Sequence, residues 1–230
     1  MAFKDTKRNI ERKHITPTSA IESYIIDKIV RIYPQWVTPD LLTFSAFFFG
    51  LLLLPVYYLS NFNPSFIWVA SLLYFLHWFT DATDGSLAIY RKRPRPNYGN
   101  YIDHTLDSIT LIAMILGLGI SPILSIEVSL ALLFVFFIWD LQAAYLSSYE
   151  KVVRISTHGF GGTEGRMLVI LLQTHWFFFQ DNIIFGMPAM ELIAWTVLAV
   201  MSVFVIRDVI KNASYLKAVD ETKLPKTGKR

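Results

Sequence analysis

The chain has 230 residues, of which 53% are hydrophobic and 17% are charged, and its mean hydropathy is +0.42. Soluble domains are about 25% charged, so this composition indicates a membrane protein. The net charge of only +3 argues against a nucleic-acid-binding protein. The absence of cysteine excludes disulfides, thiolate metal sites and a cysteine nucleophile.

Residues 1–34 are predicted to form a cytoplasmic N-terminal segment that contains one amphipathic helix. Within residues 19–33, isoleucines recur at helical spacing among charged residues, at Ile21, Ile25, Ile29 and Ile32. This pattern is typical of a helix that lies in the membrane interface. The alternative is a helix that packs against other cytoplasmic parts of the protein.

Six apolar runs follow the amphipathic segment. They cover residues 41–60, 65–90, 101–120, 124–149, 167–180 and 187–206. A helix of about twenty residues spans about 30 Å, the thickness of the hydrocarbon core of a bilayer; the fifth run is the shortest. The sequence therefore predicts an all-α integral membrane protein with six transmembrane helices in residues 35–207, followed by a basic cytoplasmic tail in residues 208–230.

The basic residues predict the orientation of these helices. All 21 Lys and Arg lie before the first run, after the second, after the fourth, or after the sixth. Six spans place these segments on one side of the membrane, which the positive-inside rule assigns to the cytoplasm; five or seven spans would divide them. We therefore expect both termini and the active site to be cytoplasmic, in the plasma membrane of a prokaryote or the endoplasmic reticulum of a eukaryote.

Four aspartates lie near the cytoplasmic ends of the second and third runs. Asp81 and Asp84 are three residues apart, and Asp103 and Asp107 are four apart, so each pair occupies one face of its helix. A short loop joins the two helices, which predicts that they are antiparallel neighbours and that the four carboxylates converge. Ionisable groups within membrane helices are costly and point to a functional site.

Four neighbouring carboxylates require a counter-charge, and oxygen ligands suit Mg²⁺, Mn²⁺ or Ca²⁺. Gly85, Ala88 and Gly99 leave room beside them for a ligand. The intervening loop adds the basic residues Arg91, Lys92, Arg93 and Arg95. Because Mg²⁺ held by carboxylates binds phosphate as its other partner, the residues indicate a diphosphate substrate. The alternative is a set of solvated aspartates at helix ends, paired with the loop arginines.

Two segments resemble the signature of the CDP-alcohol phosphotransferase family: Asp81-Ala-Thr-Asp84-Gly85-Ser-Leu-Ala88 and Gly99-Asn-Tyr-Ile-Asp103-His-Thr-Leu-Asp107. The signature reads D-x2-D-G-x2-A-R, a spacer of about eight residues, and G-x3-D-x3-D. Seven of its eight fixed positions match. The first apolar run is preceded by Thr38-Pro39-Asp40-Leu-Leu-Thr43, which is similar to the family's T-P-N-x-L-T stretch. With the six-helix layout, the resemblance covers most of the chain.

One signature position departs from the family pattern. Where the signature has an arginine, this chain has Ile89. Arg91 is the candidate replacement because it lies about 20° from the helical face of Asp84, and Arg93, one turn beyond Ile89, is its rival. The family's arginine contacts the cytidine diphosphate, so the departure bears on nucleotide binding.

The resemblance implies transfer of a phosphoalcohol group from a CDP-alcohol donor to a lipid or polar alcohol acceptor, with release of CMP. It implies a homodimer among membrane lipids and two divalent ions, Mg²⁺ or Mn²⁺, held by Asp81, Asp84, Asp103 and Asp107. Asp107 is the candidate general base by its place in the motif. His104 is the rival base, as in the D-H-x-x-D-S form of the choline and ethanolamine branch.

A second stretch, Thr163-Glu164-Gly165-Arg166, resembles the P-T-E-x-R stretch of the same amino-alcohol branch. Glu164 and Arg166 would then belong to the acceptor or headgroup site; the alternative is a helix start with Thr163 as its cap. These residues favour CDP-choline or CDP-ethanolamine as donor and diacylglycerol as acceptor.

Three other functions remain as alternatives. The first is transfer from CDP-diacylglycerol to glycerol phosphate, inositol phosphate or serine. A cation transporter would place its polar groups near the membrane midplane, whereas here they lie at the cytoplasmic edge. A non-catalytic scaffold would agree with the lost arginine, but all four aspartates are retained.

Overall fold

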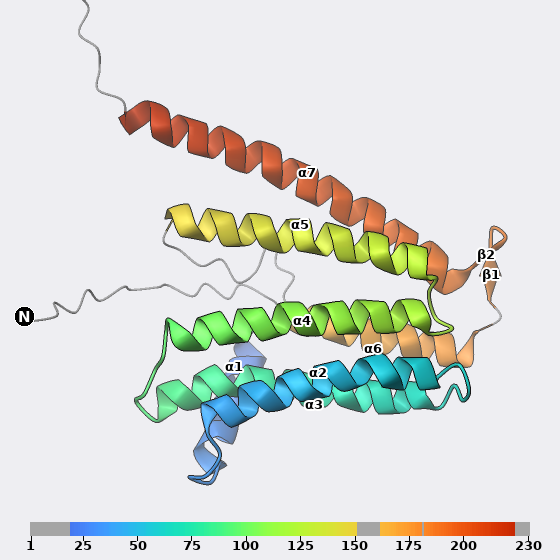
Figure 1. Ribbon diagram of the computed structural model, residues 1–230, viewed down its shortest axis with the longest axis horizontal. Helices are drawn as coiled ribbons and strands as arrows, with labels where there is room; N and C mark the ends of the chain where they lie inside the picture. Colours follow the sequence, from blue (N-terminus) through green and yellow to red (C-terminus); the bar gives the residue numbers. More distant parts are fainter. Residues whose placement is uncertain (1–18, 151–161, 181, 224–230) are drawn as a thin grey trace, which may run out of the picture.

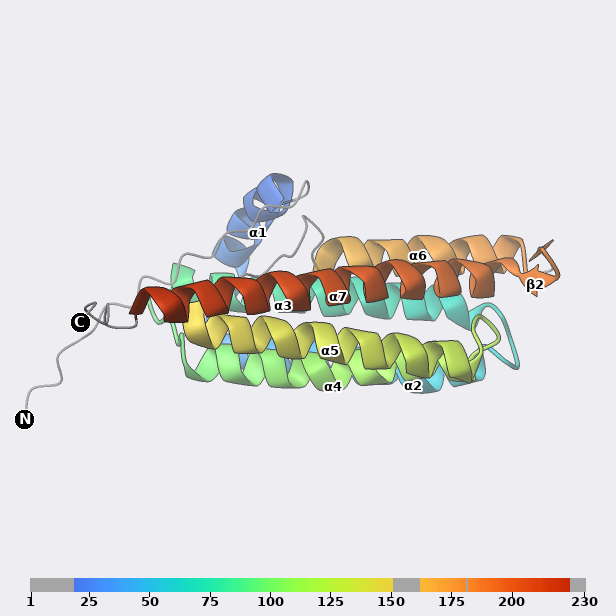
Figure 2. The same cartoon turned by 90° about the horizontal axis from the view of Figure 1, so that it is seen from above.

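The computed structural model describes residues 19–150, 162–180 and 182–223. In these ranges the chain forms helices α1 (Ser19–Ile32), α2 (Pro39–Leu59), α3 (Phe66–Tyr90), α4 (Tyr98–Ile120), α5 (Ile126–Glu150), α6 (Gly162–Phe178) and α7 (Ala189–Lys223). A short hairpin pairs β1 (Ile183–Ile184) with β2 (Met187–Pro188). Helices α2 to α7 run along one common direction, and α1 lies at an angle to them near one end (Figures 1 and 2).

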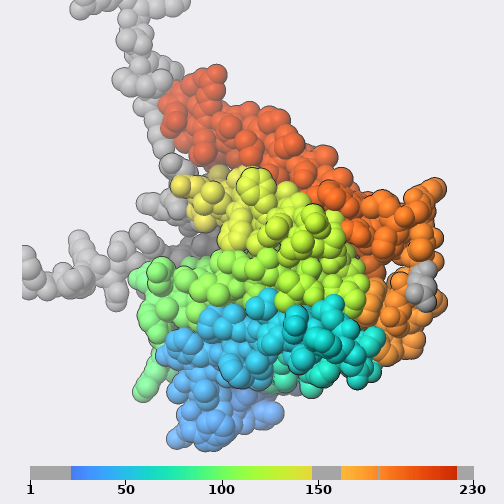
Figure 3. Space-filling model, turned by 45° about the vertical axis from the view of Figure 1, so that its right-hand side comes forward, coloured from blue at the N-terminus to red at the C-terminus, as the bar shows by residue number. Residues whose placement is uncertain are grey.

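Helices α2, α4, α5 and α7 pack side by side in this order. Helix α2 contacts α3 and α4, α4 contacts α5, and α5 contacts α7, while α1 and α6 both pack on α3. Figure 3 shows a face on which the colours pass from blue through green and yellow to red, in the same order. Large apolar side chains cover the outside of the bundle, among them Phe48, Phe75, Phe134, Leu171 and Val203. Such a surface is suited to lipid.

In the described part of the chain, four helices are long and apolar enough to cross a membrane: α2, α4, α5 and α7. The prediction of an all-helical integral membrane protein is confirmed, but six spans are not shown. Helix α6 has 17 residues. Helix α3 has 25 residues and is long enough. However, its second half contains the buried polar residues His77, Thr80 and Thr83, which make it less apolar.

The largest difference from the predicted boundaries concerns α7. The sixth apolar run ends at residue 206, whereas α7 continues to Lys223, into the predicted tail. A charged residue ends an apolar run but does not end a helix, and no Gly or Pro occurs between Ala189 and Pro225. The β-hairpin was also not predicted; Phe185 and Gly186 at its turn both have positive φ, 53° and 79°, as type I′ turns require.

Helix α1 is the predicted amphipathic helix. Ile26 and Val30 are buried in a cluster with Leu42 and Leu87 of the bundle. On its other side, α1 exposes apolar side chains, namely Tyr24, Ile25 and Ile32. The helix therefore packs against the bundle through one face and keeps a second apolar face exposed.

The preceding residues 1–18, with five of the basic residues used for the orientation, lie outside the described ranges, as do Lys151 and Arg154.

At Gly50, below the aspartates, α2 lies in close contact with both α3 and α4. A Cβ atom at Gly50 would overlap the Thr110 methyl group of α4 and would lie 2.9 Å from His77 Cδ2 of α3. His77 is one turn from Asp81, and Thr110 is one turn from Asp107. The missing side chain therefore allows the two helices that carry the aspartates to converge against α2.

Replacing Gly50 by alanine is expected to destabilise the fold by about 1–3 kcal/mol, because the methyl group must displace Thr110 or His77. Gly165→Ala is the matched control, since its Cβ would meet no atom within 4 Å; we expect it to be neutral or stabilising by up to about 1 kcal/mol. Thermal unfolding in detergent compares the two variants. Equal stability of Gly50→Ala and the native chain would contradict the close approach.

Candidate active site

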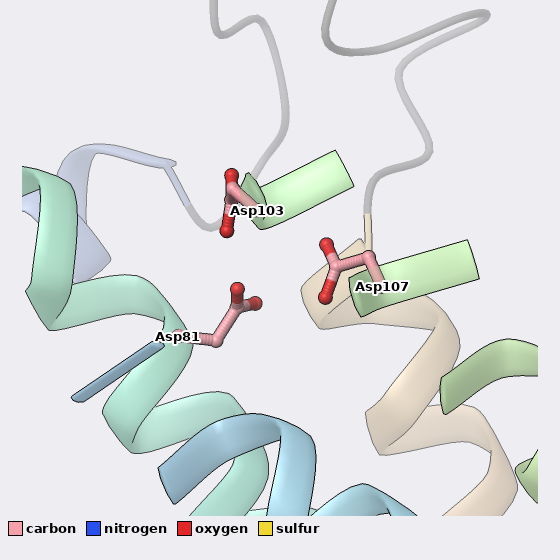
Figure 4. A group of neighbouring side chains, drawn as sticks. All are labelled: Asp81, Asp103 and Asp107. Carbon is pink, nitrogen blue, oxygen red and sulfur yellow. The ribbon is translucent and has the colours of Figure 1, made fainter. Parts of the chain in front are cut away.

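Three of the four predicted aspartates converge. Asp81 of α3 and Asp103 and Asp107 of α4 each offer a carboxylate oxygen, and these oxygens lie within 4.8 Å of one another. Figure 4 shows the three carboxylates pointing toward a common centre from the two helices. All three residues are half-buried. We call Asp81, Asp103 and Asp107 the acidic cluster.

Asp84 is oriented differently from the other three. It is buried, and its carboxylate accepts hydrogen bonds from the Thr43 hydroxyl of α2 and from the backbone N–H of Gly85. Donors of this kind are what a buried carboxylate needs. Thr43 was not predicted as a site residue, although it ends the T-P-x-x-L-T stretch. That stretch also starts α2, where the Thr38 side chain caps the N–H of Leu41.

Arg166 of α6 reaches the acidic cluster. Its Nη2 atom lies 2.8 Å from Asp81 Oδ2, and both side chains are 18% exposed. An ion pair of such low exposure is screened less by solvent than a surface pair. Glu164 is half-buried in the first turn of α6, two residues before Arg166. The structure thus brings one residue of the second motif, Arg166, into contact with the first.

The loop arginines have different partners. The guanidinium of Arg91 donates to the backbone carbonyls of Pro34 and Val37, in the turn between α1 and α2. Arg95 binds both carboxylate oxygens of Asp40, each at 2.6 Å. Both side chains tie the α3–α4 loop to the start of α2. Arg91 is therefore engaged by backbone oxygens, and its role as replacement for the signature arginine stays a prediction.

The remaining predicted residues lie between Asp81 and Asp107 in the sequence. Arg93 and His104 are exposed, at the loop and on α4 respectively. Gly85 and Ala88 follow Asp84 on α3, where Ala88 is buried. Gly99 lies in the first turn of α4, where a Cβ would make an ordinary contact at 3.8 Å with Arg95.

A polar junction joins three helices beside the acidic cluster. The indole N–H of Trp78 lies 3.2 Å from Glu22 Oε1 of α1 and 3.1 Å from Thr163 Oγ1 of α6. The Thr163 hydroxyl in turn donates to the same Glu22 oxygen at 3.0 Å. The three residues are half-buried. Sequence reasoning missed this junction because its members are 56 to 141 positions apart and no local pattern links them.

The comparisons with known proteins agree with this geometry. Ethanolaminephosphotransferase 1 of Homo sapiens is 30% identical over 156 residues, which are 58% of this chain and 38% of that protein. The protein of the same name from Mus musculus is 34% identical over 107 residues, 40% of this chain and 27% of its own length. The chain thus spans well under half the length of these relatives.

The family match covers a larger part of the chain. The family described as CDP-alcohol phosphatidyltransferase matches residues 36–207. This range contains both aspartate-bearing helices and the whole of α6. It therefore includes every residue of the acidic cluster together with Arg166. The chain belongs to the CDP-alcohol phosphatidyltransferase family.

Proposed function

We propose that this chain transfers a phosphoalcohol group from a CDP-alcohol to an acceptor hydroxyl at the membrane and releases CMP. The observation that supports this most is the convergence of Asp81 with Asp103 and Asp107 in a chain of this family. The ethanolaminephosphotransferase relatives favour CDP-ethanolamine as donor, with CDP-choline as the closest alternative. Diacylglycerol is the proposed acceptor.

The donor atoms of the acidic cluster fit a divalent cation. Half-buried carboxylate oxygens within 4.8 Å of one another suit a hard ion such as Mg²⁺ or Mn²⁺. Asp81, Asp103 and Asp107 would hold it, and Asp84 would join them for a second ion. When bound, such ions attract the diphosphate and offset the charge on the leaving CMP.

The residues around the cluster then have separate tasks. The acceptor oxygen forms a bond to the phosphorus that carries the alcohol, and the bond from that phosphorus to the CMP oxygen breaks. CMP leaves with the electron pair of that bond, and Asp107 takes the proton of the acceptor hydroxyl. Arg91 and Arg93 are proposed to serve the nucleotide, and Glu164 and Arg166 the acceptor or headgroup.

The topology is also part of the proposal. We place α3 and α6 in the membrane with the four apolar helices, because both lie along the bundle (Figures 1 and 2). The described Lys and Arg residues belong to α1, the α3–α4 loop, the start of α6 and the second half of α7. This distribution supports a cytoplasmic acidic cluster. The homodimer stays a prediction from the family resemblance.

The donor is tested with the purified chain in detergent and Mn²⁺, using diacylglycerol with either CDP-ethanolamine or CDP-choline, and CDP-diacylglycerol with serine, glycerol phosphate or inositol phosphate. We expect CMP release with CDP-ethanolamine and diacylglycerol, and at least tenfold less with CDP-diacylglycerol, a difference of about 1.4 kcal/mol. Release only from CDP-diacylglycerol would reassign the donor. No CMP from any pair would contradict the proposed activity.

The general base is tested by Asp107→Asn and His104→Gln, both measured at saturating Mn²⁺ so that metal affinity does not limit the rate. We expect Asp107→Asn to lower kcat by about 10²–10⁴-fold, the usual contribution of a general base, and His104→Gln to lower it by less than tenfold. Asp27→Asn, on the exposed surface of α1, controls for the substitution. The opposite ranking of Asp107 and His104 would make His104 the base.

A further inference from the structure

One carboxylate of the acidic cluster already has a cation from the protein itself. Asp81 belongs to the cluster, and its Oδ2 atom is paired with Arg166 at 2.8 Å. The guanidinium of Arg166 is protonated at any physiological pH. Arg166 therefore supplies positive charge at the position where the proposed function requires divalent cations.

The charges of the cluster explain why a cation is needed there in the absence of metal. Three carboxylates with oxygens within 4.8 Å repel one another, and each is half-buried. A charge removed from water without a partner costs several kcal/mol. Other described arginines pair elsewhere, Arg31 with Asp27 and Arg95 with Asp40. Arg166 thus compensates the cluster locally.

The surroundings hold Arg166 near the cluster without enclosing it. Thr163, one turn earlier on α6, is fixed by its contacts with Trp78 and Glu22, so the first turn of the helix is anchored. The guanidinium lies back over Gly162, where a Cβ would be 3.7 Å from Arg166 Nη1. The backbone that carries Arg166 is therefore positioned, while the Arg166 side chain keeps 18% exposure.

We propose that Arg166 is a resident counter-ion that is exchanged when a divalent cation binds. Its ion pair with Asp81 stabilises the metal-free protein and opens when the Asp81 carboxylate becomes a metal ligand. The inference rests on the proposed function, because it assumes that the acidic cluster holds the metal. It assigns to Arg166 a competition with metal that is separate from any contact with substrate.

The exchange has a measurable consequence for metal affinity. Divalent cations must compete with the guanidinium, and the apparent dissociation constant rises as the fraction of the protein with a free Asp81 falls. Removal of the guanidinium also removes a like charge from beside the bound cation. Loss of Arg166 is therefore expected to strengthen metal binding, whereas loss of a residue that only orients a ligand would weaken it.

The experiment measures binding of Mn²⁺ alone to the full chain in detergent, by the electron paramagnetic resonance of free Mn²⁺. We expect Arg166→Gln to bind Mn²⁺ about tenfold more tightly than the native chain. Its melting temperature without metal should be lower, and the rise on adding Mn²⁺ should be larger. Arg31→Gln, which removes the exposed pair with Asp27, should leave Mn²⁺ affinity unchanged.

Two further results separate the possible failures. Arg166→Lys, which keeps the charge but loses the forked geometry, should bind Mn²⁺ with intermediate affinity and serves if Arg166→Gln does not fold. Unchanged or weaker Mn²⁺ affinity in the folded variants overturns the exchange and leaves the proposed function intact. Absence of Mn²⁺ binding in the native chain, together with no CMP release, overturns both.

Discussion

Negative charge held among apolar helices is the constraint on which the rest of this structure depends. The acidic cluster brings three carboxylate oxygens within 4.8 Å of one another. Such charges are stable only with partners, because removing an unpaired charge from water costs several kcal/mol. Arg166 supplies a partner for Asp81, and Thr43 with the Gly85 N–H supplies donors for Asp84.

The scaffold around the cluster serves to bring these partners together. Gly50 allows α3 and α4 to converge against α2, one turn below the aspartates. The junction of Glu22, Trp78 and Thr163 joins α1 and α6 to α3. It therefore helps to position the first turn of α6, which carries Arg166. The arginines of the α3–α4 loop act at the other side, where they attach the loop to the start of α2. Arg91 and Arg95 therefore hold the chain in place, whereas Arg166 compensates the charge of the cluster.

Much of the fold could be predicted because membrane helices have a simple local cause. An uninterrupted apolar run long enough to cross lipid must satisfy its own backbone hydrogen bonds, and only a helix does this within one segment. Each of the six runs corresponds to one helix from α2 to α7. The boundary that differs most is the end of α7, where the helix continues beyond the apolar run through a mixed polar and apolar stretch to Lys223.

The sequence alone determined the class of the protein, the helix that carries each aspartate and the pairing of Asp103 with Asp107, because helical periodicity sets which residues share a face. Only the tertiary structure decided that Asp84 turns to Thr43, that Arg91 binds backbone carbonyls and that Arg166 joins the acidic cluster. Those contacts join residues that are 41 to 85 positions apart in the sequence and that belong to different elements of the fold. The partner of each residue depends on how the helices pack and on which side chain then lies next to a buried charge. The spacing of residues along the chain encodes neither.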